Sequence, residues 1–582
     1  MKQHCLISVL IFFVTGVAFL SAAHFGLAPC DDPYYVANGP AIQNGLSFSG
    51  LSFALTDVDQ GIWMPLSYLS FMLDYSIGWG FGGMHIQSIF WHGINAVLFY
   101  FLLLHLFKNR TAAILAALFW SIHPLRVESV VWIASRKDVL STFFLLCALS
   151  AWLKAEKDNI VWIAVSIVLF TFGVMAKPSI MVFTVFAIAI DFLVTNNRKD
   201  PRIYYALIGI SILIAYFASW QQSMGGATQA ANQIPIWYRL MNAVASLTVY
   251  LGNIVWPRNL AMQCMIRYPD LPRFNYIGLT CLICICAILA KIAVPRLIRF
   301  FKTQDVESLL VGGTSENVIL AACVVFFGSL VPFLGIVGFG IHAFADRFTI
   351  LPTLGLSMLI AYLISKARNN IVLLSSVTLF PLWYACYCQT QYWRDNGILI
   401  SHTLEVDRQE NSEMQRTLAL HIWENEHDME KVYVHLKKAY DSVRNEAEKE
   451  QMASVSCHFL IEACYDTGRA DEAEDLYYWF RKINNKIYGN MGDGIEFMMA
   501  EVLFLLNSNQ HDGIAQAEEI LNRINLQRPG TYIAANIAYR IALKKNDKAK
   551  IRTALELCAQ TCQPSTYCKC LWAKELLKKY AE

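Results

Sequence analysis

Positive charge is missing from the opening part of the chain. After Lys2, no Lys or Arg occurs before Lys108, although the 582 residues include 47 of them. Charged residues of both signs make up only 16% of the chain, and 56% of the residues are hydrophobic. So little charge over such a length excludes an ordinary soluble protein and predicts a polytopic helical membrane protein.

Two functional classes lack support because the features they need are missing. The net charge is +2 and the basic residues are dispersed, so no basic stripe indicates nucleic-acid binding. A transporter with many spans commonly has internal repeats with broken helices at matched positions, and this sequence has no such symmetry. A membrane-anchored scaffold without catalytic activity remains an alternative.

The apolar segments predict about eleven membrane spans, since a helix needs about 20 apolar residues to cross a bilayer. They cover residues 5–27, 86–107, 111–123, 139–154, 159–176, 179–194, 203–220, 275–295, 317–338, 349–366 and 370–389. A cleaved signal peptide is the alternative for the first segment, since Ser21, Ala22 and Ala23 suit a signal peptidase. If the N-terminus is cytoplasmic, most of the short cationic loops fall on the cytoplasmic side.

The segment 240–256 is apolar enough to be a further span. Counting it would place Arg296, Arg299 and Lys302 outside and would break the charge bias. We therefore predict that residues 221–274 form an outer loop with a re-entrant or interfacial helix.

The composition changes after Thr390. Residues 391–582 are charged, helical in periodicity and without further spans. Residues 464–480 have Gly468 and small residues at the positions typical of a tetratricopeptide-like helix–turn–helix. Weaker copies of this pattern follow at 500–521 and 534–555. The sequence predicts two domains, a membrane domain over 1–390 and a helical repeat domain over 391–582, with the second on the outer side.

The first outer loop, residues 28–85, has carboxylates and aromatic residues but no cation. Asp31 and Asp32 follow the first span directly. One interpretation is a solvated pair of carboxylates at a helix end. The other is a general base or metal ligand, because a neighbouring carboxylate and a low-dielectric boundary raise a carboxyl pKa toward the useful range.

Cations occur in other predicted outer loops, against the usual bias. The candidates for binding a substrate phosphate or its surroundings are His123, Arg126, Glu128, Arg136, Lys137, Asp346 and Arg347. Such side chains would hold a phosphate group at the membrane surface. The alternative is that Arg126 only forms an ion pair with Glu128 or Asp138.

Polar residues also occur at the start of the predicted span 86–107 and within it. His85, His92 and, more loosely, Asn95 share one helical face. They could form a metal site with Asp31 or Asp32, so a divalent metal ion is left open. Hydrogen bonds between helices are the favoured interpretation.

Several motifs together resemble the bacterial relatives of the transmembrane and tetratricopeptide-repeat-containing O-mannosyltransferases. The matching segments are His123–Val130, Arg136–Ser141, Trp63–Ser70, Trp256–Pro257, Asp346–Thr349 and Tyr392–Asn396. The resemblance covers about residues 28–405. The chain departs from the family at Met64, where His is usual, and at Phe348, where Tyr is usual.

The resemblance implies a membrane glycosyltransferase of the GT-C class that uses a polyprenyl-phosphate sugar and inverts the anomeric carbon. It implies that Asp31 or Asp32 deprotonates the acceptor hydroxyl. From the residues themselves we predict Asp31 as the base and Asp32 as its partner or a metal ligand. The cations predicted to hold the phosphate are Arg126, Arg136, Lys137 and Arg347. The expected product is mannose or another hexose on Ser or Thr of exported proteins, presented by the repeat domain. An envelope glycan or lipid acceptor is the alternative. The expected location is a bacterial inner membrane, with the active-site loops and the repeats on the periplasmic side.

Overall fold

A computed structural model describes the chain except for some short segments. These are residues 1, 30, 38, 58–61, 156–158, 225–233, 263, 266–271, 305–311, 337–341, 408–410, 443–445, 489–494, 509–511, 528–530, 562–570 and 580–582. The chain divides into two compact units, Met1–Leu399 and Ile400–Glu582.

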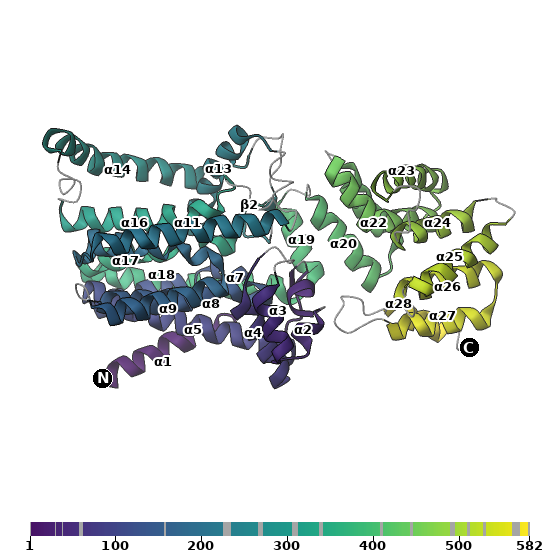
Figure 1. Ribbon diagram of the computed structural model, residues 1–582, viewed down its shortest axis with the longest axis horizontal. Helices are drawn as coiled ribbons and strands as arrows, with labels where there is room; N and C mark the ends of the chain where they lie inside the picture. The colour runs from purple at the N-terminus through teal and green to yellow at the C-terminus, as the bar shows by residue number, and fades with distance from the viewer. Residues whose placement is uncertain are drawn as a thin grey trace. The chain divides into compact units, whose positions relative to one another are not determined.

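Unit 1 is built mainly from α-helices (Figure 1). They are α1 (Lys2–Val17), α2 (Pro40–Gln43), α3 (Phe48–Thr56), α4 (Pro65–Ile77), α5 (Gly80–Phe107), α6 (Arg110–Ser121), α7 (Val127–Val131), α8 (Arg136–Lys154), α9 (Ile160–Ala176), α10 (Phe183–Ala189), α11 (Pro201–Met224), α13 (Ile236–Val255), α14 (Tyr276–Thr303), α16 (Thr314–Leu330), α17 (Pro352–Lys366) and α18 (Asn369–Gln391). Two short strands, β1 (Cys264–Met265) and β2 (His342–Phe344), pair in antiparallel fashion.

Every predicted span falls largely on helical segments, but fewer than eleven qualify by length and composition. Among the described residues, six are long and apolar enough to cross a membrane: Gly80–Phe107, Pro178–Thr195, Pro201–Ser223, Tyr276–Thr303, Thr314–Phe333 and Asn369–Arg394. A seventh results if α6 and Pro124–Val131, bent by 56°, count as one span. The helices α1, α9 and α17 are shorter than the roughly 20 residues that a hydrocarbon core requires.

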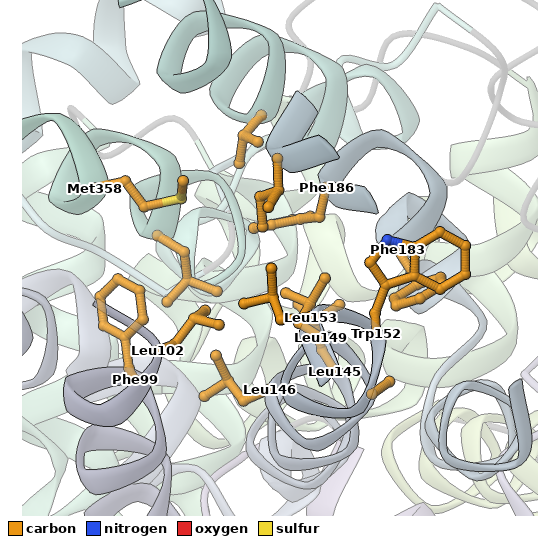
Figure 2. Close-up of a cluster of buried hydrophobic side chains, with 14 of the residues drawn as sticks. Phe99, Leu102, Leu145, Leu146, Leu149, Trp152, Leu153, Phe183, Phe186 and Met358 are labelled. Atoms are coloured by element: carbon orange, nitrogen blue, oxygen red, sulfur yellow. The ribbon is translucent and has the colours of Figure 1, made fainter. Parts of the chain in front are cut away.

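The core of unit 1 lies where α5, α8, α10 and α17 meet. Figure 2 shows Phe99 and Leu102 of α5 close to Leu146 and Leu149 of α8. Trp152 donates from its indole N–H to Asp191 Oδ2 over 2.8 Å, so even the polar atom of this large side chain is satisfied. Lipid chains are as apolar as leucine, so exclusion of water does not stabilise contacts between helices in a membrane. Close packing and hydrogen bonds of this kind stabilise them instead.

The connecting segments of unit 1 gather at two opposite ends. We call one the loop end; it comprises the described parts of residues 28–79, 124–138, 177–178 and 342–349. There, Ser67 donates to the carbonyl oxygen of Ala176 over 3.0 Å. At the opposite end, Arg110 donates to Gln3 over 3.0 Å. Figure 1 shows α2, α3 and α4 at one end of the helices and the N-terminus at the other. This distribution agrees with the predicted alternation of loops.

The helix α13 lies along the loop end and does not qualify as a candidate span. Near its start, Arg239 donates to the carbonyl oxygen of Ile336 over 3.0 Å. At its end, the carbonyl oxygen of Ile254 accepts from His123 over 3.0 Å. Both ends of α13 are therefore joined to unit 1 by hydrogen bonds, and the re-entrant or interfacial helix within residues 221–274 stays a prediction.

Unit 2 is α-helical throughout its described residues. Its helices are α20 (Ser412–Asn425), α21 (Met429–Asp441), α22 (Glu446–Asp466), α23 (Ala470–Tyr488), α24 (Ile495–Asn507), α25 (Gly513–Gln527), α26 (Tyr532–Lys545), α27 (Lys548–Thr561) and α28 (Leu571–Lys579); α19 (Asn396–Val406) contains the boundary between the units. Consecutive helices pack in pairs from α20/α21 to α26/α27. Gly468 has a φ of 78°, which permits the tight turn between α22 and α23.

Candidate functional site

Asp31 is a partly exposed carboxylate of the loop end. It precedes the helical turn Pro33–Ala37, and its side chain is 35% exposed. Lys137, at the start of α8, places its Nζ 3.7 Å from Asp31 Oδ2. The same Nζ lies 4.6 Å from the ring centroid of Tyr35, and the lysine is almost wholly buried. The ring and the carboxylate together hold this cation in a fixed position beside Asp31.

Asp32 is buried, and both of its carboxylate oxygens accept hydrogen bonds. Its Oδ2 accepts from the backbone N–H of Ala28 and its Oδ1 from that of Ala134, each over 2.7 Å. Burial raises the pKa of Asp32 to about 7, against the effect of these two hydrogen bonds. The carboxylate therefore ties the Asp31 segment to residues 132–136 and offers no free oxygen to a substrate.

Arg136 is also buried, with a protein partner for each of its nitrogens. Its guanidinium lies 2.5 Å from Asp74 Oδ2 and donates to the carbonyl oxygen of Met84 over 2.7 Å. A longer bond joins its Nε to Ser88 over 3.3 Å. Arg136 thus fixes α4 and α5 against α8. The predicted phosphate contact would require it to give up one of these partners.

Glu128 and Arg347 form a second ion pair at the loop end. The Arg347 backbone N–H donates to Glu128 Oε2 over 2.7 Å, and its guanidinium pairs with Oε1. The guanidinium carbon lies 5.1 Å from the Trp132 ring. Arg347 also lies within electrostatic range of Asp31. Glu128 thus orients Arg347, and the charge of Asp31 acts on it from a longer distance.

Arg126 does not form the alternative ion pair with Glu128 or Asp138. Its Nη2 donates to Thr349 Oγ1 over 2.6 Å. Among the described residues, its Nε and Nη1 have no hydrogen-bond partner, although the side chain is buried. Unsatisfied buried donors of this kind commonly mark a place for water or a ligand.

His123 and Asp346 flank Arg126 and are themselves held by protein groups. His123 Nδ1 accepts from the Leu125 N–H over 3.2 Å, so the proton is on Nε2, which donates to Ile254. Burial and the nearby Glu128 raise the pKa of Asp346 well above its usual range. These two predicted site residues lie close to Arg126 rather than to Asp31.

Lys177 is a member of this cluster that the sequence interpretation did not single out. It is nine-tenths buried, forms an ion pair with Asp138 and lies 5.6 Å from the Phe333 ring and 5.8 Å from the Phe348 ring. These two rings stack with centroids 4.4 Å apart. The available signal was a cation in the two-residue outer turn between the predicted spans 159–176 and 179–194.

His342 of β2 completes the polar surroundings of Asp31. Burial and the charge of Arg347 lower its pKa to about 4, so the imidazole is neutral. Among the described residues, its Nδ1 has no hydrogen-bond partner. Met64, by contrast, is fully buried in a hydrophobic cluster and contributes no polar group here.

The polar residues within α5 connect helices. His85 bonds to the carbonyl oxygen of Gly26, His92 to that of Ser121 and Asn95 to that of Val139, over 3.1, 2.8 and 2.8 Å. The prediction of hydrogen bonds between helices is therefore confirmed for His92 and Asn95, whose partners lie in α6 and α8, whereas His85 bonds to the loop that contains Gly26. In the part of the chain that the structure describes, no group of three His, Cys, Asp or Glu residues could hold a metal ion.

The loop end therefore combines the partly exposed carboxylate of Asp31 with three cations from separate segments. Three groups from segments far apart in the sequence, Asp31, Lys177 and Arg347, lie within electrostatic range of Lys137. Asp31 and Arg347 also lie within electrostatic range of each other. A carboxylate of this kind can accept a proton, and clustered cations can stabilise a developing negative charge.

Comparison with known proteins relates part of the chain to sugar transferases. Residues 75–220 match the family described as dolichyl-phosphate-mannose-protein mannosyltransferase. This stretch contains Glu128, Lys137 and Lys177 but neither Asp31 nor Arg347. A protein O-mannosyl-transferase of Caenorhabditis elegans is 23% identical over 401 residues, which cover 65% of this chain and 54% of that protein. The chain thus spans about half the length of this relative.

Shorter matches point the same way. Protein O-mannosyl-transferase TMTC3 of Mus musculus is 27% identical over 113 residues, covering 19% of this chain and 12% of the relative. TMTC1 of the same species is 29% identical over 134 residues, covering 20% and 14%. No solved structure matches the chain. The chain is therefore similar at a distance to protein O-mannosyl-transferases, and residues 75–220 resemble the family described as dolichyl-phosphate-mannose-protein mannosyltransferase.

Proposed function

We propose that the chain is an inverting GT-C glycosyltransferase that moves mannose or another hexose from a polyprenyl-phosphate carrier to an acceptor hydroxyl. The observation that carries the proposal is the ion pair between the exposed Asp31 and the buried Lys137, with Lys177 and Arg347 close by. The similarity to O-mannosyl-transferases supports the donor class.

In the proposed reaction, Asp31 accepts the proton of the acceptor hydroxyl. The oxygen attacks the anomeric carbon on the face opposite the carrier, and the bond from that carbon to the phosphate oxygen breaks. The carrier phosphate leaves as an anion, and Lys137, Lys177 and Arg347 stabilise its charge. Asp31 is the base rather than Asp32, because both oxygens of Asp32 already accept backbone hydrogen bonds.

The remaining polar residues hold Asp31, Lys137 and Arg347 in position. Asp32 and Arg136 hold the segments that carry Asp31 and Lys137, and Glu128 orients Arg347. Among the residues that the structure describes, Arg126 Nε and Nη1 have no hydrogen-bond partner, so Arg126 is the remaining candidate for a phosphate contact. No step here requires a metal ion.

The acceptor in this proposal is Ser or Thr of an exported polypeptide, bound by unit 2. Its helices pack in consecutive pairs, and α20 and α22 begin 34 residues apart, the period of tetratricopeptide repeats. Stacked helix pairs form concave surfaces suited to an extended chain. An envelope glycan or lipid is the second acceptor class. The proposed location is a bacterial inner membrane with the loop end in the periplasm.

The test is mass spectrometry of envelope proteins from cells with and without this protein. Hexose-sized adducts on Ser or Thr peptides should disappear without it and return with the wild-type chain, but not with Asp31→Asn. If Asp31→Asn restored the adducts fully, the chain would act as a scaffold or use another base. If no peptide lost an adduct while an envelope glycan or lipid changed, the acceptor would be of the second class.

A further inference from the structure

A basic pocket lies at the end of unit 1 opposite the loop end. It is a cavity of about 460 Å³ lined by His4, Phe101, Leu104, His105, Lys108 and Arg110. These residues come from the start of α1, the last turns of α5 and the start of α6. From His85 to Lys108, α5 rises on the order of 35 Å, so the pocket is well separated from Asp31 and its neighbours.

The pocket carries positive charge that the surrounding sequence leaves unbalanced. No Asp or Glu occurs in residues 1–30 or in residues 75–127. Among the described residues, no carboxylate forms an ion pair with Lys108 or Arg110, and the one side-chain partner of Arg110 is the neutral amide of Gln3. The pocket is thus lined by two cations, Lys108 and Arg110, and by two imidazoles, but by no carboxylate.

The backbone around Lys108 holds both cations on the same rim. Lys108 ends α5 in the left-handed conformation, with a φ of 52°, which is uncommon for a residue other than glycine. Asn109 then caps α6 by accepting from the Ala112 N–H over 3.0 Å. The resulting turn brings Lys108 and Arg110 together beside the N-terminus of α6, whose partial positive charge also favours an anion.

The other wall of the pocket is apolar and continues along the outside of the helices. Phe101 is 43% exposed and Leu104 is half-buried. On α1, Leu6, Leu10 and Phe13 are exposed along the same helix that provides His4. A polar rim at the end of an apolar helix surface matches a molecule with a phosphate head and acyl chains.

We propose that this pocket binds the phosphate of an anionic phospholipid, with the acyl chains lying along the exposed apolar side chains of α1 and α5. Basic pockets between membrane helices are a known mode of binding such head groups. The proposal does not depend on the chemistry at Asp31.

Native mass spectrometry of the purified full chain, released from nanodiscs of phosphatidylcholine with phosphatidylglycerol, measures bound lipid directly. The wild-type chain should retain phosphatidylglycerol over phosphatidylcholine. Lys108→Gln with Arg110→Gln should weaken retention about 30-fold, at about fivefold for each cation. The control Arg299→Gln with Lys302→Gln removes two exposed cations of α14 at the same end and should leave retention unchanged.

A second variant keeps both cations of the pocket and fills the pocket with a larger side chain. Leu104→Trp should also reduce retention of phosphatidylglycerol, whereas a purely diffuse attraction to the cations would leave it intact. Added inorganic phosphate at millimolar concentration should not displace the lipid. Equal retention by wild type and both pocket variants would overturn the proposal, and displacement by free phosphate would show an anion site without lipid specificity.

Discussion

The Lys137 ammonium group is buried, while the Asp31 carboxylate that it faces across 3.7 Å is one-third exposed. The lysine is also held against the Tyr35 ring, so the cation stays in place while the carboxylate meets solvent. An incoming phosphate would share Lys137 with Asp31. The carboxylate would then be free to accept a proton, which links donor binding to activation of the acceptor.

Asp31→Asn should lower the turnover of sugar transfer by about 10²–10⁴-fold, because the amide cannot act as a base. The melting temperature of the purified protein should change little, since Asp31 is on the surface of the site. A transfer assay with a polyprenyl-phosphate mannose donor and a Ser- or Thr-containing peptide measures the rate. Asp57→Asn, which changes another carboxylate of the same loop, is the matched control. Undiminished turnover in Asp31→Asn would rule out Asp31 as the base.

Asp32 should make the stability of unit 1 depend on pH. Its pKa is about 7 in the folded chain, against an ordinary value near 3.8. Between these values the folded state binds the proton and the unfolded state does not, so stability should fall as pH rises from about 4 to about 7. The full effect is roughly 4 kcal/mol. Melting curves of wild type and Asp32→Asn from pH 4.5 to 8 should differ in slope. Asp31→Asn, which removes a smaller cause of the raised Asp32 pKa, should keep most of the wild-type slope because burial is the largest cause.

The ion pair of Glu128 and Arg347 should stabilise the loop end more than an exposed pair does. Glu128→Leu leaves the buried guanidinium without its partner and should cost about 3–5 kcal/mol. Arg202→Leu, which breaks the exposed pair with Asp200, should cost about 1 kcal/mol or less. Thermal unfolding in detergent compares the two. Equal losses would mean that Glu128 does not fix Arg347.

The sequence predicted the residues that converge, because charge at the outer ends of spans is unusual and therefore informative. Asp31, Lys137 and Arg347 were all found in this way. Their individual roles were not accessible, since hydrogen bonding and burial decide them. Nothing in the sequence distinguishes Asp32, with both oxygens bound by backbone N–H groups, from its neighbour Asp31.

The count of spans was harder to predict for a related reason. Short apolar segments such as α9 and α17 are compatible with a span or with a core helix, and length alone does not separate them. Lys177 was missed because it stands alone between two apolar segments. Only its contact with Asp138 and the Phe333 and Phe348 rings shows that it joins the cluster.

Lys177 should contribute to binding of the lipid-linked donor. Lys177→Met should raise the KM for the donor about 10–100-fold, the range expected for a hydrogen bond to a charged group. The single change also leaves Asp138 buried without its cation. The double change Lys177→Met with Asp138→Asn removes both charges and should recover stability but not donor affinity. Recovery of both would mean that Lys177 serves only to neutralise Asp138.

Unit 2 should fold when residues 411–582 are produced alone. Starting at Asn411 keeps the cap of α20, since Asn411 Oδ1 accepts from the Met414 N–H over 3.1 Å. The fragment also keeps a hydrophobic core around Val502 and Ile537, and Arg540 connects α26 to Asp466 of α22 over 3.1 Å. Circular dichroism should show a helical protein with cooperative unfolding, and size-exclusion chromatography a single species. Ile537→Ala should cost about 2–5 kcal/mol and lower the midpoint, because it opens a cavity in this core. A fragment without cooperative unfolding, insensitive to Ile537→Ala, would show that these helices depend on the rest of the chain.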